Sequence, residues 1–541
     1  MKERTVSLLS LVVLIAFGIV ALLMSRLGPS DSWRFPLAFY PLFVILLGVA
    51  FLRQSGLTMA FVGLIVTLVL AVFEFGTPVE VALGASVYGF LKSFGISISV
   101  AATMLMIFLM KEAGALQTVS RVIRQQVAGN EVQALYIGIG FGSFLSSLGV
   151  VTPALFPPLL VAMGFTPVAA IAIAVLGYDP TTSFSLLSIP ITLPAQVGSL
   201  NAIELAFKVA IFLPLVSTGF AFAVLWVVGG RESMRKGLVP AVVSGLTLAF
   251  ACLGVVSIDF FTGVEYVPIR IVGVVGGLSA MLSLHAYQKL RSTETTRARV
   301  TDYPTKQKVW RSFSPWIILT VLAFVVSLQP VGDWLSTVPG DAEKITIFTG
   351  QTVDLDVLTQ IYTWILVAIL LSLLVLRPTK TQAKNAFKIW LKRFPGPFLA
   401  FTLYFCIAFV MSSSPMNTVL GETLATVFGA GYIFVAASLG LFGAIVGGSE
   451  TTSNVLFLEI QRTACRNVGL GDAGFMTVYG SHAVAGGIAS AVTPAKINNA
   501  VVTIDGSHAT ESLIMRKHLI VAVLLTIATG VLTGIFVNVG I

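Results

Sequence analysis

Long apolar runs follow one another through almost the whole chain, and they constrain its fold more than any other feature. A helix needs about 20 apolar residues to cross a bilayer. Only 11% of the 541 residues are charged, against roughly 25% in soluble domains. The pattern predicts an all-α polytopic membrane protein with roughly 12–14 transmembrane segments. Runs long enough to span occur at 7–26, 36–53, 58–76, 95–113, 133–163, 205–229, 238–257, 267–285, 313–330, 358–376, 397–413, 430–463 and 518–540.

One of these runs is interrupted by polar residues at a depth where the chain should still lie within the bilayer. The stretch 447–454 reads Gly-Gly-Ser-Glu-Thr-Thr-Ser-Asn and directly follows the apolar residues 436–446. The two glycines allow the helix to break, and a second helix is expected to begin at Ser453 or Asn454, since both are good N-cap residues. Backbone groups in such a break must face protein or a water-filled cavity. Secondary transporters hold anions and coupling ions at breaks of this kind.

A second break with the same signature lies in the first half of the chain. Residues 141–156 align without gaps on residues 442–457, and both stretches begin with Phe-Gly and end with Leu-Phe. A further polar interruption follows each break, at 177–183 and at 480–482. Interrupted apolar segments in corresponding positions of two halves point to a transport site.

The basic loops indicate how the two halves are oriented. Cytoplasmic loops of membrane proteins are enriched in Lys and Arg, which assigns 231–236 and 289–311 to the cytoplasm. The connection 331–357 is acidic and is expected outside. The interrupted segment 474–503 then enters the membrane from the cytoplasm and 167–200 enters from outside, both as re-entrant hairpins. The two repeats are therefore predicted to be inverted.

The predicted organisation has four parts. Residues 1–94 form N-terminal transmembrane helices, 95–236 the first inverted repeat, 237–396 connecting transmembrane helices with basic cytoplasmic loops, and 397–541 the second inverted repeat. The segment 78–93 is short, and we interpret it as partial. The first apolar run is too long for a signal-peptide core and lacks a small-residue cleavage site, so we interpret it as a spanning helix that follows a cytoplasmic N-terminus.

Several classes of function lack their motifs in this sequence. It has no phosphate-binding loop for an ATP-driven pump, no His-Glu-x-x-His zinc motif and no Gly-x-Ser-x-Gly nucleophile elbow. The cysteines Cys252, Cys406 and Cys465 are isolated and show no metal-ligand spacing. The net charge of +9 comes from basic residues in short loops between apolar runs, which does not indicate nucleic acid. We expect no cofactor, no metal and no enzymatic activity.

At the second break the sequence resembles the L-lactate permease family of bacterial and archaeal carboxylate transporters. Residues 448–457, Gly-Ser-Glu-Thr-Thr-Ser-Asn-Val-Leu-Phe, are similar to the family's Gly-Ser-Asp-Thr-Ser-Ser-Asn-Ala-Leu-Phe. The similarity is expected to run from about Val81 to the C-terminus. The resemblance implies proton-coupled uptake of L-lactate, and in some members glycolate, through the plasma membrane. Further matches lie at 152–153, 158–161, 164–167 and 493–494.

The sequence departs from the family's pattern at two acidic positions. The family's Glu-Gly-Ala-Ala-Gly-Phe-Gly-Thr-Pro is Leu-Ser-Ser-Leu-Gly-Val-Val-Thr-Pro at 145–153, so Leu145 stands in place of the acid. The family's Asn-Thr-Ala-Pro is replaced by Tyr-Asp-Pro-Thr at 178–181. Relative to the family, the acid of this half has therefore moved from position 145 to Asp179, in the later interruption. This change leaves a different substrate or proton route open.

Three residues are candidates for proton coupling: Glu450, Asp179 and His482. A carboxyl in a partly dry site can load and release protons near the working pH because desolvation disfavours its charge, and Glu450 holds that position. Its alternative role is structural, as an acid bonded to backbone N–H groups. Asp179 either replaces the acid lost at Leu145 or caps a helix that begins at Pro180. His482 either relays protons or packs between helices.

Hydroxyl and amide groups at the two breaks, together with helix N-termini, suit a carboxylate and a neighbouring 2-hydroxyl. Each hydroxyl alone could equally bond to a carbonyl in the preceding turn. Lys496 either binds the carboxylate or extends to the membrane surface, and Arg270 is expected at the interface. The candidate substrate-binding residues are Ser146, Ser147, Thr152, Thr181, Thr182, Ser449, Thr451, Thr452, Ser453, Asn454, Thr493 and Lys496.

These observations predict a secondary active transporter that imports a small monocarboxylate or 2-hydroxycarboxylate by proton symport across the plasma membrane. The neutral oxygens of 452–454 leave sodium open as the coupling ion. An intramembrane enzyme, a channel and a scaffold subunit are the alternatives from other classes. The expected partners are a small organic anion, the coupling ion and the lipid bilayer, and the sequence gives no oligomeric state.

Overall fold

The computed structural model describes most of the chain and places it in helices. In the described part, nine helical stretches are long and apolar enough to cross a membrane. Strand structure there is one antiparallel hairpin of β1 (Lys344–Thr346) and β2 (Thr352–Asp354). The predicted all-α polytopic membrane class is confirmed. The described residues are 30–51, 54–124, 129–149, 156–291, 305–338, 344–355, 357–493, 496–497, 500–501, 504 and 508–540.

The first half is divided into many short helices around the predicted break. The expected single span at 133–163 is instead split into four segments, because its glycines and Pro157-Pro158 disfavour a continuous α-helix. The π-helical segments are η1 and η2, and η4 and η5 are 3₁₀ turns. In order, the elements are α2 (Ser30–Leu46), η1 (Leu47–Phe51), α3 (Gly56–Phe73), α4 (Val79–Lys92), α5 (Phe94–Glu112), α6 (Ala115–Arg124), α7 (Asn130–Leu135), η2 (Tyr136–Gly142), α8 (Ser143–Ser147), α9 (Phe156–Ala162), α10 (Pro167–Leu176), η4 (Thr182–Phe184), η5 (Leu186–Ser188), α11 (Ile189–Val197), α12 (Ala202–Ala210) and α13 (Leu213–Lys236).

The remainder of the chain has longer helices. The predicted first span, 7–26, lies outside the described residues, so the total of 12–14 crossings stays a prediction. The elements after α13 are α14 (Leu238–Thr262), α15 (Ile269–Arg291), α16 (Lys306–Ser327), α17 (Gln329–Thr337), α18 (Ile361–Leu376), α19 (Lys380–Arg393), α20 (Pro395–Ser412), α21 (Met416–Phe428), η7 (Gly429–Gly431), α22 (Tyr432–Gly447), α23 (Glu450–Asn467), α24 (Asp472–Ser490) and α26 (His508–Val539).

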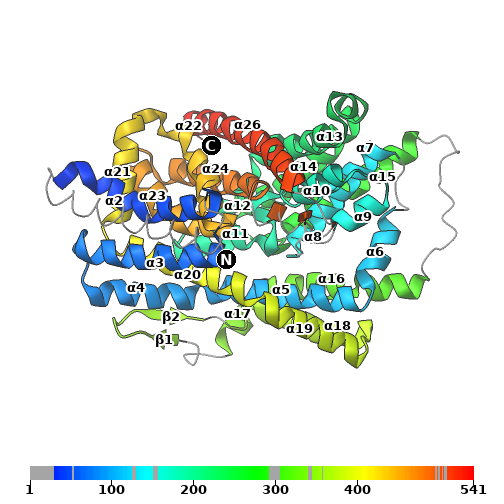
Figure 1. Ribbon diagram of the computed structural model, residues 1–541, viewed down its shortest axis with the longest axis horizontal. Coiled ribbons are helices and arrows are strands. Elements are labelled where there is room, and N and C mark those ends of the chain that lie inside the picture. Colours follow the sequence, from blue (N-terminus) through cyan, green and yellow to red (C-terminus); the bar gives the residue numbers. More distant parts are fainter. Residues whose placement is uncertain are drawn as a thin grey trace.

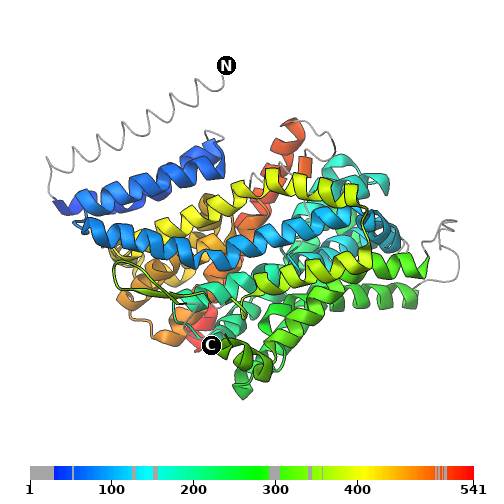
Figure 2. The ribbon, with the colours of Figure 1, turned by 90° about the horizontal axis from the view of Figure 1, so that it is seen from below.

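The helices α3, α4, α5 and α20 form a layer along one side of the molecule (Figure 1), with α20 packed on the other three. Only Ser93 separates α4 from α5, and the two helices follow each other in one line across the molecule (Figure 2). The segment predicted to be partial, 78–93, thus joins α5 in one apolar stretch of 34 residues. A Cβ on Gly89 would lie 2.8 Å from the carbonyl oxygen of Phe405, so this glycine allows α4 and α20 to pack closely.

The centre of the molecule is built from helices of both halves. In the second half, α22 packs on α23, α24 and α26. In turn α24 contacts α12 and η4 of the first half, and α23 contacts α11. The backbones of α22 and α24 meet at Gly440, where a Cβ would lie 1.9 Å from the carbonyl oxygen of His482. Small residues at helix crossings are typical of membrane proteins, because close packing holds helices together there.

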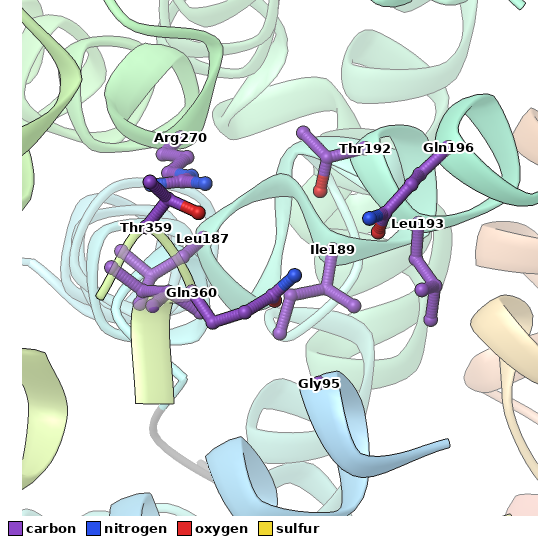
Figure 3. A pocket seen from close by; sticks show the side chains of 10 residues that line it. Gly95, Leu187, Ile189, Thr192, Leu193, Gln196, Arg270, Thr359 and Gln360 are labelled. Carbon is purple, nitrogen blue, oxygen red and sulfur yellow. The ribbon is translucent and has the colours of Figure 1, made fainter. Parts of the chain in front are cut away.

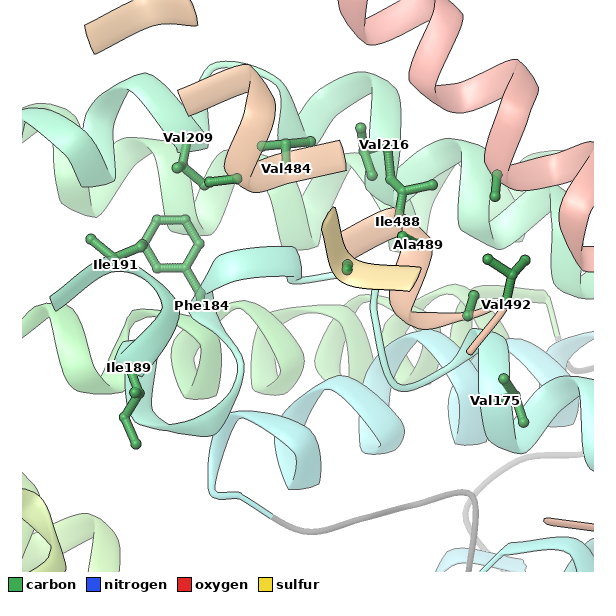
Figure 4. Close-up of a cluster of buried hydrophobic side chains, with 14 of the residues drawn as sticks. Val175, Phe184, Ile189, Ile191, Val209, Val216, Val484, Ile488, Ala489 and Val492 are labelled. Atoms are coloured by element: carbon green, nitrogen blue, oxygen red, sulfur yellow. The ribbon is translucent and has the colours of Figure 1, made fainter. Parts of the chain in front are cut away.

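An apolar cluster encloses the short turn η4 between the two halves. Phe184 of η4 lies among Ile191 of α11, Val209 of α12, and Val484 and Ile488 of α24 (Figure 4). All five side chains are buried. Dense packing of this kind leaves η4 little freedom to move, so the polar residues on either side of Phe184 are held in fixed positions against α24.

The proposed repeat pairs segments that differ in form. Residues 141–156 fall on η2, α8 and α9, whereas their counterparts 442–457 fall on α22 and α23. Residues 150–155 lie outside the described part of the chain. The inverted relation of the two repeats, and the domain boundaries drawn from it, stay predictions.

Candidate functional site

The break in the second half is shorter than expected. The helix α22 ends at Gly447, Gly448 adopts a left-handed φ of 71°, and Ser449 caps the next helix by accepting the Thr452 N–H at 3.2 Å. The helix α23 therefore begins at Glu450, and the expected start at Ser453 or Asn454 is wrong. Ser449 makes the earlier start possible because it satisfies a backbone donor of the first turn. Glu450 thus lies in the first turn of α23, where an acid is favoured.

The facing segment of the first half is a strained turn between α10 and α11. The chain passes from α10 to α11 through η4 and η5 rather than by a single helix break. Left-handed backbone in non-glycine residues costs on the order of 1–3 kcal/mol each and is concentrated at functional sites. Four such residues occur here, namely Thr182 (φ 43°), Leu186 (φ 51°), Leu187 (φ 55°) and Ser188 (φ 55°).

Glu450 connects the two halves directly. The side chain is only 6% exposed, and the Ser183 hydroxyl of η4 donates a hydrogen bond to its Oε1. One turn further along α23, Asn454 donates from Nδ2 to the Pro190 carbonyl at 2.9 Å. Tyr479 of α24 donates to the Asn454 carbonyl at 2.7 Å. The start of α23 is therefore held between the strained turn of the first half and α24.

Two glycines of α24 make room for this contact. A Cβ on Gly487 would lie 2.8 Å from the Cβ of Thr182 and 3.0 Å from Oε2 of Glu450. A Cβ on Gly486 would lie 3.2 Å from Cγ of Glu450 and 3.5 Å from Oδ1 of Asn454. Because a side chain larger than hydrogen would push these groups apart, the pair sets the distance between the two interrupted segments.

A second contact between the halves is an ion pair. Lys496, just after α24, lies 3.5 Å from Oδ1 of Asp179, and its Nζ is 3.8 Å from the centre of the Tyr178 ring. The Asp179 side chain is 3% exposed and that of Lys496 18% exposed. Ser490 also faces Asp179. Lys496 thus turns inward to the break instead of extending to the membrane surface, and Asp179 pairs with it instead of capping a helix at Pro180.

His482 of α24 lies in a closed hydrogen-bond network where α24 packs against α22 and α23. Gln461 donates from Nε2 to Nδ1 of the ring at 2.9 Å, and Tyr432 donates to Gln461 Oε1 at 2.6 Å. The Nε2 atom of the ring faces Ser453 Oγ at 3.2 Å. The ring also stacks on Tyr479 with a centroid distance of 5.8 Å. Both ring nitrogens are therefore occupied by protein groups, which fits helix packing; a proton-relay role for His482 stays a prediction.

The structure divides the predicted substrate-binding residues into two sets. In one set the hydroxyl already bonds to nearby protein: Ser146 to the Ser143 carbonyl, Ser449 and Thr452 to each other, Ser453 to the Gly440 carbonyl and Thr493 to the Ser490 carbonyl. In the other set a buried oxygen has no partner among the described residues: Ser147 Oγ, Thr181 Oγ1, Thr182 Oγ1, Thr451 Oγ1 and Asn454 Oδ1. Thr152 lies outside the described residues.

Four of these five unpartnered oxygens belong to the segments that meet at Glu450. Thr181 and Thr182 directly precede Ser183 at the start of η4, and Thr451 and Asn454 lie in the first two turns of α23. Ser147 belongs to α8 and lies against Gly273 of α15, close to the carbonyl oxygen of Phe184 in η4. Buried polar atoms are normally paired, so a group of unpaired oxygens around a buried acid is the arrangement expected of a ligand site.

Sequence reasoning missed several residues of this site. Ser183 was visible as the end of the Thr-Thr-Ser run at 181–183, but nothing local indicated that it would meet Glu450. The Gly486-Gly487 pair was a possible signal, since adjacent glycines inside a membrane helix often mark close contacts. Among the described residues, no group of three or more His, Cys, Asp and Glu side chains is arranged to hold a metal ion.

The fold and the site define a class of protein: a multi-pass membrane transporter, in which interrupted helices bring polar groups together inside the membrane. A family model described as L-lactate permease matches residues 35–540. The chain belongs to the L-lactate permease family. The match begins well before the predicted boundary at Val81 and includes α2 and α3.

Individual relatives are similar over most of the chain. The glycolate permease GlcA of Escherichia coli strain K12 is 24% identical over 495 residues, which cover 83% of this chain and 86% of that protein. An L-lactate permease of Streptococcus iniae is 25% identical over 442 residues, 80% of this chain and 91% of its own. The solved structure of the Alcanivorax borkumensis YdaH transporter covers 90% of this chain and 99% of its own at 13% identity. Its TM-score of 0.44 is too low to support an argument.

Proposed function

We propose that the protein imports a small monocarboxylate or 2-hydroxycarboxylate, such as lactate or glycolate, by proton symport across the plasma membrane. Family membership and the names of the relatives support the substrate class. The observation that carries the proposal is the buried Glu450, bonded by Ser183 of the opposite half and bordered by unpartnered oxygens. A titratable group at the junction of two moving halves can couple its protonation to their movement.

Glu450 is the proposed carrier of the proton. A buried charge is costly unless a partner compensates it, and Glu450 makes no direct ion pair among the described residues. Proton binding removes that charge and adds an O–H donor, while proton loss leaves a carboxylate that needs donors such as Ser183. The two protonation states therefore favour different surroundings, which is the requirement for coupling.

Lys496 and the unpartnered oxygens are proposed to bind the substrate. A carboxylate gains charge-assisted hydrogen bonds from an ammonium group, and Lys496 already holds one carboxylate, that of Asp179, at 3.5 Å. The hydroxyls of Thr181, Thr182 and Thr451 can each donate to the carboxylate or accept from a substrate hydroxyl. A 2-hydroxycarboxylate presents both groups on adjacent carbons, so it matches a site of this composition.

A sodium-coupled transporter is the second candidate, and a specific observation favours it. Sodium binds through oxygen ligands, and four buried oxygens without partners among the described residues belong to the two segments that meet at Glu450: Thr181 Oγ1, Thr182 Oγ1, Thr451 Oγ1 and Asn454 Oδ1. Neutral oxygens with one carboxylate make an adequate site for a monovalent cation. The coupling ion must therefore be tested directly.

Uptake into proteoliposomes separates the two candidates. Vesicles containing the purified protein receive labelled L-lactate or glycolate under an inward proton gradient without sodium, or under an inward sodium gradient at equal pH. Proton symport predicts accumulation in the first case, lost when a protonophore is added, and none in the second. Accumulation driven by sodium alone would replace the proton proposal by the sodium one, and equilibration without accumulation under either gradient would contradict both.

A further inference from the structure

A cavity of about 210 Å³ lies beside the strained turn and away from the side chains that surround Glu450. It is formed between α11, the first turn of α15, and the residues that begin α5 and α18. Leu187 and Ile189 give it an apolar side. The acidic connection 331–357 precedes α18 directly, so the cavity lies at the ends of α15 and α18 that the loop charges assign to the outside.

Polar side chains from three separate segments turn into this cavity. Figure 3 shows Arg270, Thr359 and Gln360 on one side and Thr192 and Gln196 of α11 on the other, with their polar ends directed into the space between them. One cationic group and several hydroxyl and amide groups opposite an apolar wall is a lining that suits a carboxylate with a short carbon chain.

Arg270 is the charged group of this lining. Among the described residues it takes part in no salt bridge. Glu265 acts on it electrostatically, but Oε1 of Glu265 accepts the Ile269 N–H at 2.6 Å and so serves the start of α15. A guanidinium presents five donors in a planar fork that matches a carboxylate. Its fork is therefore available to an anion in the cavity.

We propose that this cavity is an outer binding site for a small carboxylate, held by Arg270, from which the substrate passes to the break at Glu450. That the bound carboxylate is the transported substrate rests on the proposed function; that the cavity binds a small carboxylate does not. A separate outer site is useful to an importer because it raises the local concentration of an anionic substrate at the entrance.

The outer site is joined to the inner one by the strained turn. Ser188 donates a hydrogen bond at 2.7 Å to the carbonyl of Ile269, the residue before Arg270. Leu187, next to Ser188, both lines the cavity and adopts left-handed backbone. The other end of the same turn holds Ser183, which bonds to Glu450. A carboxylate that binds Arg270 and shifts the start of α15 would therefore also shift the strained turn, whose other end contacts Glu450.

Cysteine labelling of the full-length protein in membrane vesicles tests the binding site itself. The native cysteines Cys252, Cys406 and Cys465 are buried, so Gln196→Cys, at an exposed position of the lining, reports reaction with a charged maleimide. L-lactate or glycolate should slow this reaction several-fold more than sodium chloride of equal ionic strength. Arg270→Gln should abolish the protection, whereas Arg291→Gln should not, since Arg291 lies at the opposite end of α15 and bonds to Tyr287. Thr359→Cys provides a second reporter.

Uptake kinetics give an independent readout. Arg270→Gln should raise the apparent KM for the carboxylate about tenfold or more, the effect of losing one charged hydrogen-bonding partner, with little change in the maximal rate; Arg270→Lys should lie between. Protection that survives Arg270→Gln at both reporters, equal protection by chloride, or an unchanged KM would overturn the proposal. If the wild-type protein shows Arg270-dependent protection but no transport, the outer site stands and the proposed function fails.

Discussion

At the scale of single residues, the space around Glu450 depends on two glycines that lack side chains as well as on the polar groups that contact the carboxylate. Gly486 and Gly487 lack side chains where Glu450, Asn454 and Thr182 approach α24. The hydroxyl of Ser183 then reaches the carboxylate from the opposite half. A larger side chain at either glycine will therefore push the two interrupted segments apart, without replacing any group that contacts the Glu450 carboxylate.

Gly487→Ala tests this confinement. The added Cβ would lie 2.8 Å from Cβ of Thr182 and 3.0 Å from Oε2 of Glu450, and overpacking a tight site costs about 1–3 kcal/mol. We expect the rate of transport to fall about tenfold to a hundredfold, because the added methyl group displaces Glu450 and Thr182 from the positions that transport needs. Initial uptake rates in vesicles with matched protein content provide the measurement.

Gly474→Ala is the matched control on the same helix. Its Cβ would meet the nearest atom, Cβ of Leu470, at 3.4 Å, an ordinary contact. Transport by this variant should equal that of the wild type. If Gly487→Ala also transports at the wild-type rate, then the contact between Thr182, Glu450 and α24 does not set the geometry of the site.

The sequence could predict the kind of residue at the site but not which atoms remain free. Glu450, Thr451 and Asn454 follow a glycine pair after an apolar run, and that pattern was enough to identify a polar break. Ser146 and Ser453 carry the same chemistry in the same pattern, yet their hydroxyls bond to the carbonyls of Ser143 and Gly440. Such bonding depends on the local backbone and on contacts between helices, which periodicity does not encode.

At the scale of elements, the polar side chains of the site come from short interrupted segments rather than from the middle of long helices. The turn between α10 and α11 contributes Asp179 and Ser183. The start of α23 contributes Glu450, and the chain just after α24 contributes Lys496. The sequence predicted both interruptions, but the further interruption that it predicted at 480–482 is wrong, because these residues lie inside the continuous helix α24. It could not fix the start of α23, because Ser449, Ser453 and Asn454 are all competent caps, and only the accepted Thr452 N–H selects Ser449.

The Asp179–Lys496 pair is expected to hold these elements together. Removing one partner of a buried pair leaves an uncompensated charge and costs about 3–5 kcal/mol. Asp179→Asn and Lys496→Met should each lower the melting temperature of the protein in detergent, whereas the double variant should recover most of the loss because no charge is left unpaired. If the two single effects add in the double variant, the residues do not interact.

At the scale of the whole molecule, the two halves meet through side chains far apart in the chain. Ser183 and Glu450 are 267 residues apart, and Asp179 and Lys496 are 317 apart. No local pattern predicts such contacts. The proposed repeat pairs 141–156 with 442–457, whereas the first-half residues that make these contacts belong to the later interruption at 177–183. The resemblance to the family predicts an acid at the position of Leu145, and this chain has Asp179 in the later interruption of the same half. Two buried acids thus lie where the halves meet: Asp179 is paired with a cation, and Glu450 makes no ion pair within the described part of the chain.

Glu450→Gln measures the central claim, that Glu450 carries the coupling proton. Glutamine resembles the protonated acid and cannot release a proton, so the variant should still exchange external labelled lactate or glycolate for internal unlabelled substrate at a rate near that of the wild type. It should fail to accumulate the same substrate under an inward proton gradient, whereas the wild-type protein accumulates it. Both rates are measured in the same proteoliposomes. Accumulation by Glu450→Gln to the wild-type level would contradict the claim, and Asp179 would become the candidate for the proton.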